Sequence, residues 1–561
     1  MKRTFYTIAL AAALLAVGCQ KEKGAVTLGA DLVNSNTKVY IDNSTPKWNE
    51  GDPVWVNGNA EHAITDVNGT SGKIRGVAEA SQYLAIYPAE YASGTASAPT
   101  VTIPAQQSYT LNSGNQKMIT PMAAVTTGSH LFFYNLCSLV KVTVENNTGD
   151  DFGLKKITVK ANNDYLGGTT SLIVDADNET VTANPMTSGF KTVTLTFPAN
   201  TVVADGGSQE CYIAVAPFAN ANDITITVHT SNNKKFVRTR SIASLDGNTI
   251  ASARLNVDAL QTTGYFTVNT STNLKVRFSP GNLQYKSSNT SDEGTFRFAE
   301  HQYDYVGFDH AGRGTVYVGN TKCNNIITEV SSWPSTNYHT NNLWIDLFGW
   351  GTSGQNRKGC YASSDNSSYG NGSNPIAGTL YDWGRRNSAS LGGDVNWRTL
   401  TQQEWNTLLT GRGSHFPSID GTRAKYLQVT LTGLSDGTHN IAAYGVIIFP
   451  DDFEWPESLP FPTNLNVIGQ HSAAQHYTLE DWAVLEEAGA VYLPSTGYRQ
   501  HTVEPNNANI FSNLYYWTAT NSSSTNAYAV RIECNSNGTL TTTDTRSRSN
   551  GCAVRLVTEV Q

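Results

Sequence analysis

Short stretches of alternating apolar and polar residues run through the first half of the chain and constrain its fold more than any other feature. Examples are Val140–Val144, Thr192–Phe197 and Ile224–Val228, in which every second residue is apolar. Alternation with a period of two predicts β-strands with one buried face. Asn/Gly/Asp-rich turns separate the stretches, and helical periodicity is missing from residues 24 to about 260. Regularly spaced strands of this kind are typical of β-sandwiches, so we expect a mainly β fold.

Residues 1–19 have the pattern of an export signal. A basic start, Met1–Arg3, precedes the apolar run Ile8–Val17, which has the length of a signal-peptide core and is short for a membrane span. The run leads to Ala16–Cys19, where small residues precede a cysteine as in the lipobox of bacterial lipoproteins. We therefore expect lipidation at Cys19 and a lipid-anchored protein on the outer membrane, at the cell surface. An ordinary signal peptide with a chance cysteine is the alternative.

The composition fits an exported protein and argues against a nucleic-acid partner. Charged residues are 15%, aromatic residues are 10%, and the net charge is −8, so there is no basic footprint. Neither a C-x-x-C nor an H-E-x-x-H motif occurs, and we expect no metal and no cofactor. Six cysteines remain beside Cys19, and an even number in an exported protein permits disulfides. Pairing in chain order, one of several possibilities, would join Cys137 to Cys211, Cys323 to Cys360, and Cys534 to Cys552.

A series of motifs in residues 20–261 resembles the fimbrillin-like proteins of Bacteroidetes, of the Mfa-like or FimA type. In chain order the motifs are Trp48–Asp52, Tyr83–Pro88, Val101–Gln107, Leu131–Val144 and Cys211–Pro217. The resemblance implies two transthyretin-like β-sandwiches, over 20–128 and 129–261, and a pilus subunit or related surface lipoprotein. Many such pilins mature by cleavage after an early Arg, which opens a groove for a donor strand. Here Arg75 is the first Arg after the signal, which leaves assembly by donor-strand insertion into a fimbrial stalk open.

Beyond about residue 262 the aromatic residues become denser and two helices are predicted. They cover Gln402–Thr410 and Leu479–Ala488, and each begins with a capping box and ends at a glycine. The capping residues are Thr401 with Glu404, and Thr478 with Asp481. Trp405 and Trp482 lie on the apolar faces of these helices, so we expect both in the core.

Motifs throughout 262–561 resemble the major-paralogous (FISUMP) domain of Bacteroidetes. They include Phe278–Tyr285, Phe296–Glu300, Trp344–Gly351, Trp397–Trp405, Val491–Arg499, Tyr516–Thr520 and Val554–Val557. The resemblance implies an α+β, C-type-lectin-like domain that is related to the formylglycine-generating enzymes.

Three possible active or metal sites in this region have simpler interpretations. The related enzymes use a close Cys pair, whereas Thr545–Cys552 holds one Cys and the nearest other is Cys534, which favours a structural disulfide. Gly433–Gly437 matches G-x-S-x-G, but β-stretches flank it on both sides and a hairpin turn is predicted. Glu504–Asn507 matches the E-P-N of calcium-dependent lectins but lacks their following Asn-Asp pair, which favours a polar turn. We expect no catalytic residue.

Tyr, Asn and Arg are concentrated in the last strands, as in a paratope, where rigid aromatic rings stand beside adaptable hydrogen-bonding groups. The predicted ligand-binding residues are Tyr516, Asn521, Asn526, Tyr528, Arg531, Asn535, Asn537, Arg546 and Arg548. The chain is therefore predicted to be a cell-surface adhesin, resembling a pilus tip, with a lectin-like head for a host or bacterial glycan or protein. A stand-alone glycan-binding lipoprotein and a formylglycine-generating-type enzyme are the alternatives.

Overall fold

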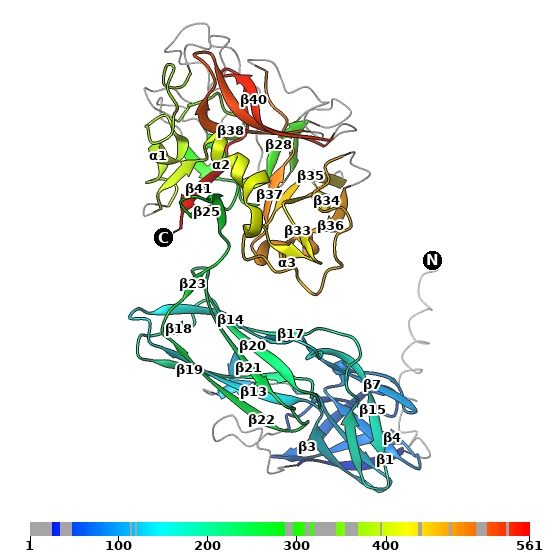
Figure 1. Ribbon diagram of the computed structural model, residues 1–561. Coiled ribbons are helices and arrows are strands. Elements are labelled where there is room, and N and C mark those ends of the chain that lie inside the picture. Colours follow the sequence, from blue (N-terminus) through cyan, green and yellow to red (C-terminus); the bar gives the residue numbers. More distant parts are fainter. Residues whose placement is uncertain are drawn as a thin grey trace, which may run out of the picture. The chain divides into compact units, whose positions relative to one another are not determined.

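The computed structural model describes residues 25–33, 48–112, 115–117, 120–286, 295–308, 315–318, 344–353, 369–392, 395–435, 440–469, 474–500, 513–534 and 538–560. Several predicted features lie outside these ranges: Cys19 and the signal segment, Cys323, Cys360, Glu504–Asn507, Asn535 and Asn537. The chain forms two compact units, Met1–Gln261 and Thr262–Gln561. Both are built mainly from strands, so the predicted mainly β fold is confirmed (Figure 1). In the described ranges, no helix combines the length and the apolar character that crossing a membrane requires.

Seven strands form a closed barrel in the first part of the N-terminal unit. In spatial order they are β1 (Ala25–Leu32), β12 (His130–Asn135), β11 (Met122–Thr126), β5 (Tyr83–Tyr87), β2 (Pro53–Val56), β3 (Asn59–Asn68) and β4 (Ser71–Ala78). The sheet closes because β1 pairs in parallel with β12 and antiparallel with β4. We expected a transthyretin-like β-sandwich over 20–128, and the pairing of β1 on both sides joins these strands into one closed sheet instead. Trp48 fills the barrel and donates from Nε1 to the carbonyl oxygen of Ala30 at 3.1 Å.

The hairpin of β11 and β12 crosses the boundary that we predicted between residues 128 and 129. Met122 pairs with Asn135 across this hairpin. Leu131 and Phe133, on β12, are buried in the barrel core. The barrel therefore continues to Asn135, because its last strand supplies part of its core.

The second part of the N-terminal unit packs two sheets around a large apolar core. One sheet has the order β19 (Ser208–Val215), β13 (Ser138–Asn146), β22 (Ile250–Val257). The other has the order β23 (Gln261–Thr262), β21 (Lys234–Ile242), β20 (Asn222–Thr230), β14 (Phe152–Ala161), β17 (Thr192–Thr196), β8 (Gln106–Ser108), with β18 (Val202–Val203) also paired to β14. A third sheet joins β16 (Thr180–Ala183), β15 (Gly168–Asp175), β7 (Ala98–Ile103) and β6 (Ala92–Thr95), and β7 contacts the short helix η1 (Ala89–Tyr91). A separate hairpin is formed by β9 (Thr110–Asn112) and β10 (Asn115–Lys117).

The C-terminal unit combines several small sheets with three short α-helices among its described residues. Its larger sheets are β24 (Phe266–Asn269), β25 (Leu274–Phe278), β41 (Leu556–Glu559), β31 (Trp397–Thr399); β36 (Gln475–Thr478), β34 (Tyr426–Ser435), β35 (Asn440–Ile448), β37 (Val491–Pro494); and β38 (Asn513–Asn521), β39 (Asn526–Glu533), β40 (Thr539–Ser547). The smaller ones are β27 (Thr295–Phe298), β26 (Leu283–Lys286), β30 (Trp344–Ile345); β28 (Tyr305–Phe308), β29 (Thr315–Val318); and β32 (Ser418–Ile419), β33 (Thr422–Arg423).

The helices begin where the capping boxes predict. Both boxes are formed, by Thr401 before α2 (Gln402–Asn406) and by Thr478 before α3 (Leu479–Glu487). A π-helical turn, η4 (Thr407–Gly411), continues α2, and a 3-10 turn, η5 (Gly413–His415), follows it. Trp405 and Trp482 are buried, as expected. The third described helix, α1 (Trp383–Asn387), is capped by Asp382, whose side chain accepts from the backbone N–H of Gly384.

The G-x-S-x-G segment lies between two paired strands, as the hairpin prediction requires. Ser435 ends β34 and pairs with Asn440, which begins β35. A nucleophile elbow needs a helix directly after the serine. A strand follows here, so the hydrolase interpretation is wrong.

The described cysteines do not form the predicted disulfides: Cys137, Cys211, Cys534 and Cys552 are all free and buried. Cys211 lies opposite Val142 on β13, while Cys137 directly precedes β13. Five residues of strand separate those two positions, roughly 17 Å, and a disulfide needs Cα atoms within about 7 Å. Each of the two predicted pairs is also divided between two different apolar clusters. Pairing in chain order failed because neighbours in the sequence face different cores.

Candidate binding face of the C-terminal unit

Six of the predicted ligand-binding residues, Tyr516, Asn521, Asn526, Tyr528, Arg531 and Arg546, lie on the three-stranded sheet of β38, β39 and β40, but not on one face of it. Tyr515 is opposite Arg531, and Tyr516 is opposite Val530, across β38 and β39. Because side chains alternate along a strand, Arg531 shares its face with Tyr515 rather than with Tyr516. Tyr516 faces the other way, into the core, where its hydroxyl group donates to Asn282 Oδ1 at 3.2 Å. The prediction of Tyr516 as a ligand-binding residue is therefore not supported by its position.

Arg546 on β40 is held between two tyrosine rings. Its guanidinium carbon is 4.5 Å from the ring centroids of both Tyr498 and Tyr515. Its Nη2 donates to the hydroxyl oxygen of Tyr515 at 3.2 Å, and its Nε donates to Asp544 Oδ2 at 2.5 Å. Cation–π contacts of this kind are worth about 0.5–2 kcal/mol each, depending on desolvation. Arg546 is thus fixed in place while 17% of its side chain stays accessible.

Arg531 extends this arrangement along the sheet. Its Nη1 lies 3.4 Å from Asp544 Oδ1, and its Nη2 lies 3.4 Å from Glu533 Oε2. Its side chain is 26% exposed. The two arginines and two carboxylates cancel in formal charge. We call the six residues on this face the tyrosine–arginine strip: Tyr498, Tyr515, Arg531, Glu533, Asp544 and Arg546.

The pKa values of both Tyr515 and Arg546 lie above their ordinary values. Desolvation raises the pKa of Tyr515 well above its ordinary value, so its hydroxyl group stays protonated. Desolvation alone would lower the pKa of Arg546, but Tyr515 and Asp544 outweigh it and raise that pKa. Because Tyr515 is only 2% exposed, the strip presents chiefly the partly exposed guanidinium groups of Arg531 and Arg546, with Tyr498 beside Arg546. Such groups can stack on a flat apolar surface and exchange hydrogen bonds with a polar ligand.

Arg548 has a structural position rather than a surface one. It is 1% exposed, and its guanidinium carbon lies 4.5 Å from the ring centroid of Trp350. It donates to the carbonyl oxygens of Gly372 and, at 2.6 Å, Ser523. It therefore ties two loops together. The residue was predicted to bind ligand because Tyr, Asn and Arg are concentrated in these last strands, but backbone carbonyl oxygens satisfy its guanidinium group in the interior.

The remaining described residues of the prediction lie near the ends of β38 and β39 where these two strands are joined. Asn521 donates from Nδ2 to the carbonyl oxygen of Ser373 at 2.6 Å, so it joins the loops that Arg548 holds. Asn526 and Tyr528 are half-buried on β39. Tyr528 is two residues from Val530, so the alternation places it on the face opposite to the strip.

Sequence reasoning missed Tyr498, Tyr515, Glu533 and Asp544. Tyr515 could have been found, because alternation counted from Arg531 selects it once the pairing of β38 with β39 is known. Tyr498 could not, because it comes from a segment outside this sheet. A β-bulge between Ala529 and Arg531 also shifts the register of β39 against β40, and the local sequence pattern does not predict this bulge.

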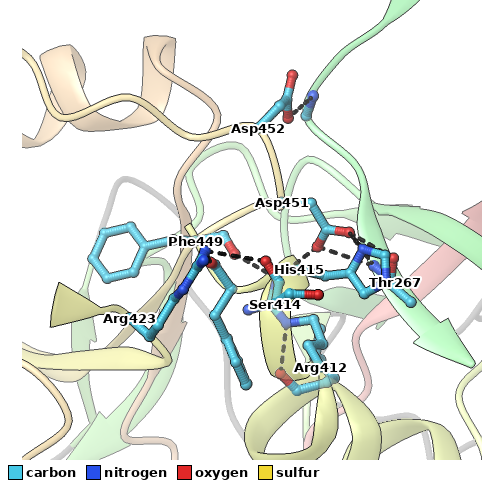
Figure 2. Close-up of polar contacts among 11 residues, drawn as sticks. Thr267, Arg412, Ser414, His415, Arg423, Phe449, Asp451 and Asp452 are labelled. Carbon is cyan, nitrogen blue, oxygen red and sulfur yellow. Dashed lines mark hydrogen bonds and ion pairs between the residues drawn. The ribbon is translucent and has the colours of Figure 1, made fainter. Parts of the chain in front are cut away.

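A second polar cluster in this unit is shown in Figure 2. Arg412 is fully buried and pairs with Asp451, Nη1 to Oδ1, at 2.8 Å. Its Nε donates to the carbonyl oxygen of Leu408, and its Nη1 donates to that of Phe449. Asp451 also accepts from Thr267, at 3.2 Å from the backbone nitrogen and 2.5 Å from Oγ1. Burial lowers the pKa of Arg412 to about 10, which still leaves it charged at neutral pH. The cluster anchors the first strand of the unit, and its central Arg412–Asp451 pair is nearly inaccessible, so we assign it a structural role.

The described residues show no catalytic or metal constellation. No group of three or more His, Cys, Asp or Glu side chains that could hold a metal ion occurs among them. Burial raises the pKa of Cys534 to about 12, and that of Cys552 rises even further. Both thiols are therefore protonated and belong to different apolar clusters, unlike a close redox pair.

No family model and no curated protein matches the chain. Solved structures with partial similarity include proteins proposed to act in cell adhesion. One from Bacteroides ovatus is 15% identical, with a TM-score of 0.27, over 42% of this chain and 94% of that one. One from Bacteroides uniformis is 14% identical, with a TM-score of 0.27, over 43% and 96%. The C-terminally truncated tip fimbrial protein Mfa3 from Porphyromonas gingivalis is 9% identical, with a TM-score of 0.21, over 39% and 81%. At such low identities and TM-scores, neither the fold nor the function of this chain follows from these similarities.

Proposed function

We propose that this chain is a cell-surface adhesin and that its C-terminal unit binds ligand through the tyrosine–arginine strip. The observation that carries the proposal is Arg546, held between the rings of Tyr498 and Tyr515. Such a clamp orders a long side chain before any ligand arrives, which lowers the entropic cost of binding. The ligand is a glycan or a protein of a host or bacterial surface, since aromatic rings and hydrogen-bonding groups suit both. Lipidation at Cys19 would hold the protein at the outer membrane.

The placement of strand β41 supports a terminal or stand-alone adhesin over a shaft subunit. β41 is a central strand, between β25 and β31. Arg398 on β31 also donates to Glu559 Oε1 at 3.0 Å. A strand that is paired on both sides cannot be given to a neighbour without opening its own sheet. β41 is therefore poorly suited to be a donor strand, which favours a protein that ends a fibre or acts alone.

An array of glycans and surface proteins, probed with residues 20–561, tests the proposal. Arg546→Ala should abolish binding to any ligand found, and Arg546→Lys should weaken it, because lysine keeps the charge but not the planar stacking. Arg254→Ala is a matched control, since Arg254 is an exposed strand arginine paired with Glu145 in the other unit. Binding that survives Arg546→Ala at full affinity, with the fold intact, would rule out the strip as the site.

A further inference from the structure

Strand β19 is at the edge of its sheet, next to β13 only. Along such a strand, the backbone groups of alternate residues point away from the sheet. The hydrogen-bond partners of the backbone groups show which residues point outward here: Glu210, Tyr212, Ala214 and Ala216. An open row of this kind is a template for another strand.

Two glutamine side chains occupy the middle of this row. The backbone N–H of Tyr212 donates to Gln116 Oε1 at 2.8 Å, and Gln116 Nε2 donates to the carbonyl oxygen of Tyr212 at 2.9 Å. Likewise, the backbone N–H of Ala214 donates to Gln107 Oε1 at 3.0 Å, and Gln107 Nε2 donates to the carbonyl oxygen of Ala214 at 2.7 Å. A carboxamide has one acceptor and one donor side, as a peptide group does. Each glutamine therefore makes the two hydrogen bonds that a residue of an added strand would make.

The positions on either side are also satisfied. Gln209 donates from Nε2 to the carbonyl oxygen of Glu210 at 2.7 Å. The backbone N–H of Ala216 donates to the carbonyl oxygen of Leu166 at 2.7 Å. The outward backbone groups of this edge, from the carbonyl oxygen of Glu210 to the N–H of Ala216, therefore all have hydrogen-bond partners although no strand lies beside them.

The glutamines come from a segment that is also attached to the opposite sheet. Gln107 lies on β8, whose backbone pairs in parallel with β17. Tyr109, two residues later, stacks on Phe197 with ring centroids 4.7 Å apart. Gln116 is buried, with 7% exposed. The segment thus closes the side of the sandwich along which β19 would otherwise be open.

We propose that Gln107 and Gln116 form a side-chain lock that closes the β19 edge to strand addition by a second copy of this chain. The strand itself is suited to self-pairing. A two-fold axis at Ile213 would place Tyr212 opposite Ala214 of the second copy, and Glu210 opposite Ala216. All four backbone groups that the lock occupies would then pair, and no like charges would meet. The lock keeps the protein a monomer at this edge.

Sedimentation velocity of residues 20–561 over a range of concentrations tests the lock. The natural sequence should stay monomeric, whereas Gln107→Ala with Gln116→Ala should dimerise as its concentration rises. Adding Ala214→Pro should abolish that dimer, because proline has no N–H to donate. Gln106→Ala is the matched control, since Gln106 is the exposed neighbour on the same strand, and it should remain monomeric. A folded double variant that stays monomeric would overturn the proposal, and so would a dimer that persists with Ala214→Pro.

Amide hydrogen exchange keeps the proposal testable if the double variant does not fold. In the single variant Gln116→Ala, the amide of Tyr212 should exchange roughly fivefold faster or more, which corresponds to the loss of one hydrogen bond. The amide of Ala214, which Gln107 still holds, should change less. Unchanged protection at Tyr212 would show that Gln116 does not cover this edge.

Discussion

Removing the charge of Asp451 should destabilise the C-terminal unit more than almost any other single-atom change in it. Asp451→Asn replaces one oxygen of the carboxylate that pairs with Arg412, and both side chains are nearly inaccessible, at 5% and 0% exposed. Arg412 would keep its bonds to the carbonyl oxygens of Leu408 and Phe449, but its charge would have no counter-ion (Figure 2). Breaking a buried pair in this way costs about 3–5 kcal/mol. For a unit of this size, that corresponds to a fall in Tm of roughly 5–8 °C.

Differential scanning calorimetry suits this test because the chain has two compact units. Only the transition of the C-terminal unit should move in Asp451→Asn. Asp452→Asn is a matched control, since the neighbouring carboxylate accepts from the backbone N–H of Gly264 at 3.0 Å and is only half-buried. Its effect should stay within about 1 kcal/mol. Combining Arg412→Met with Asp451→Asn should cost less than the sum of the single changes, because the two side chains are coupled. Equal shifts in Asp451→Asn and Asp452→Asn would refute this account of the buried pair.

Three further predictions follow from burial and pairing. Burial raises the pKa of Asp382 to about 6, against the hydrogen bonds from Thr399 that favour its charged form. Near pH 5 the folded state therefore holds a proton on Asp382 that the unfolded state releases. The free energy of unfolding should rise by about 1 kcal/mol from pH 7 to pH 5. Denaturant titrations of Asp382→Asn should lack this rise. The buried thiols of Cys534 and Cys552 should react with a thiol reagent only after unfolding, and a disulfide between them in peptide mapping would contradict the structure. Arg75 lies within β4, paired to β1 and β3, so an Arg-specific protease should cleave there slowly, and rapid cleavage of the folded chain would show that β4 opens.

Local signals in the sequence predicted local structure well. The capping boxes at Thr401 and Thr478 place two helix starts because a cap depends on residues only three positions apart. Period-two alternation likewise located β13, β17 and β20, since it records which face of a strand is buried. Helix caps and strand alternation can be recognised without knowing which other segments of the chain they contact.

Features that depend on which strands meet were beyond local patterns. Tyr516 was selected for the ligand face and its neighbour Tyr515 was not, although one step along a strand exchanges core and surface. Arg548 was expected at the surface, but the carbonyl oxygens that bind it come from loops about 25 and 176 residues away in the sequence. The disulfide predictions failed for the same reason, because proximity in sequence says little about which core a cysteine enters.

The central strand β41 and the edge strand β19 both bear on whether the chain can polymerise. A subunit within a strand-exchange polymer must give one strand and accept another. Strand β41 is paired on both sides, so giving it away would break the sheet that begins the C-terminal unit. If the lock at β19 behaves as proposed, that edge does not accept a strand either, because Gln107 and Gln116 already make its hydrogen bonds. A further route is the barrel, where β1 would have to leave both β4 and β12. A polymer that exchanges β1 would therefore require the barrel to open, and the pairing of β1 on both sides opposes that opening.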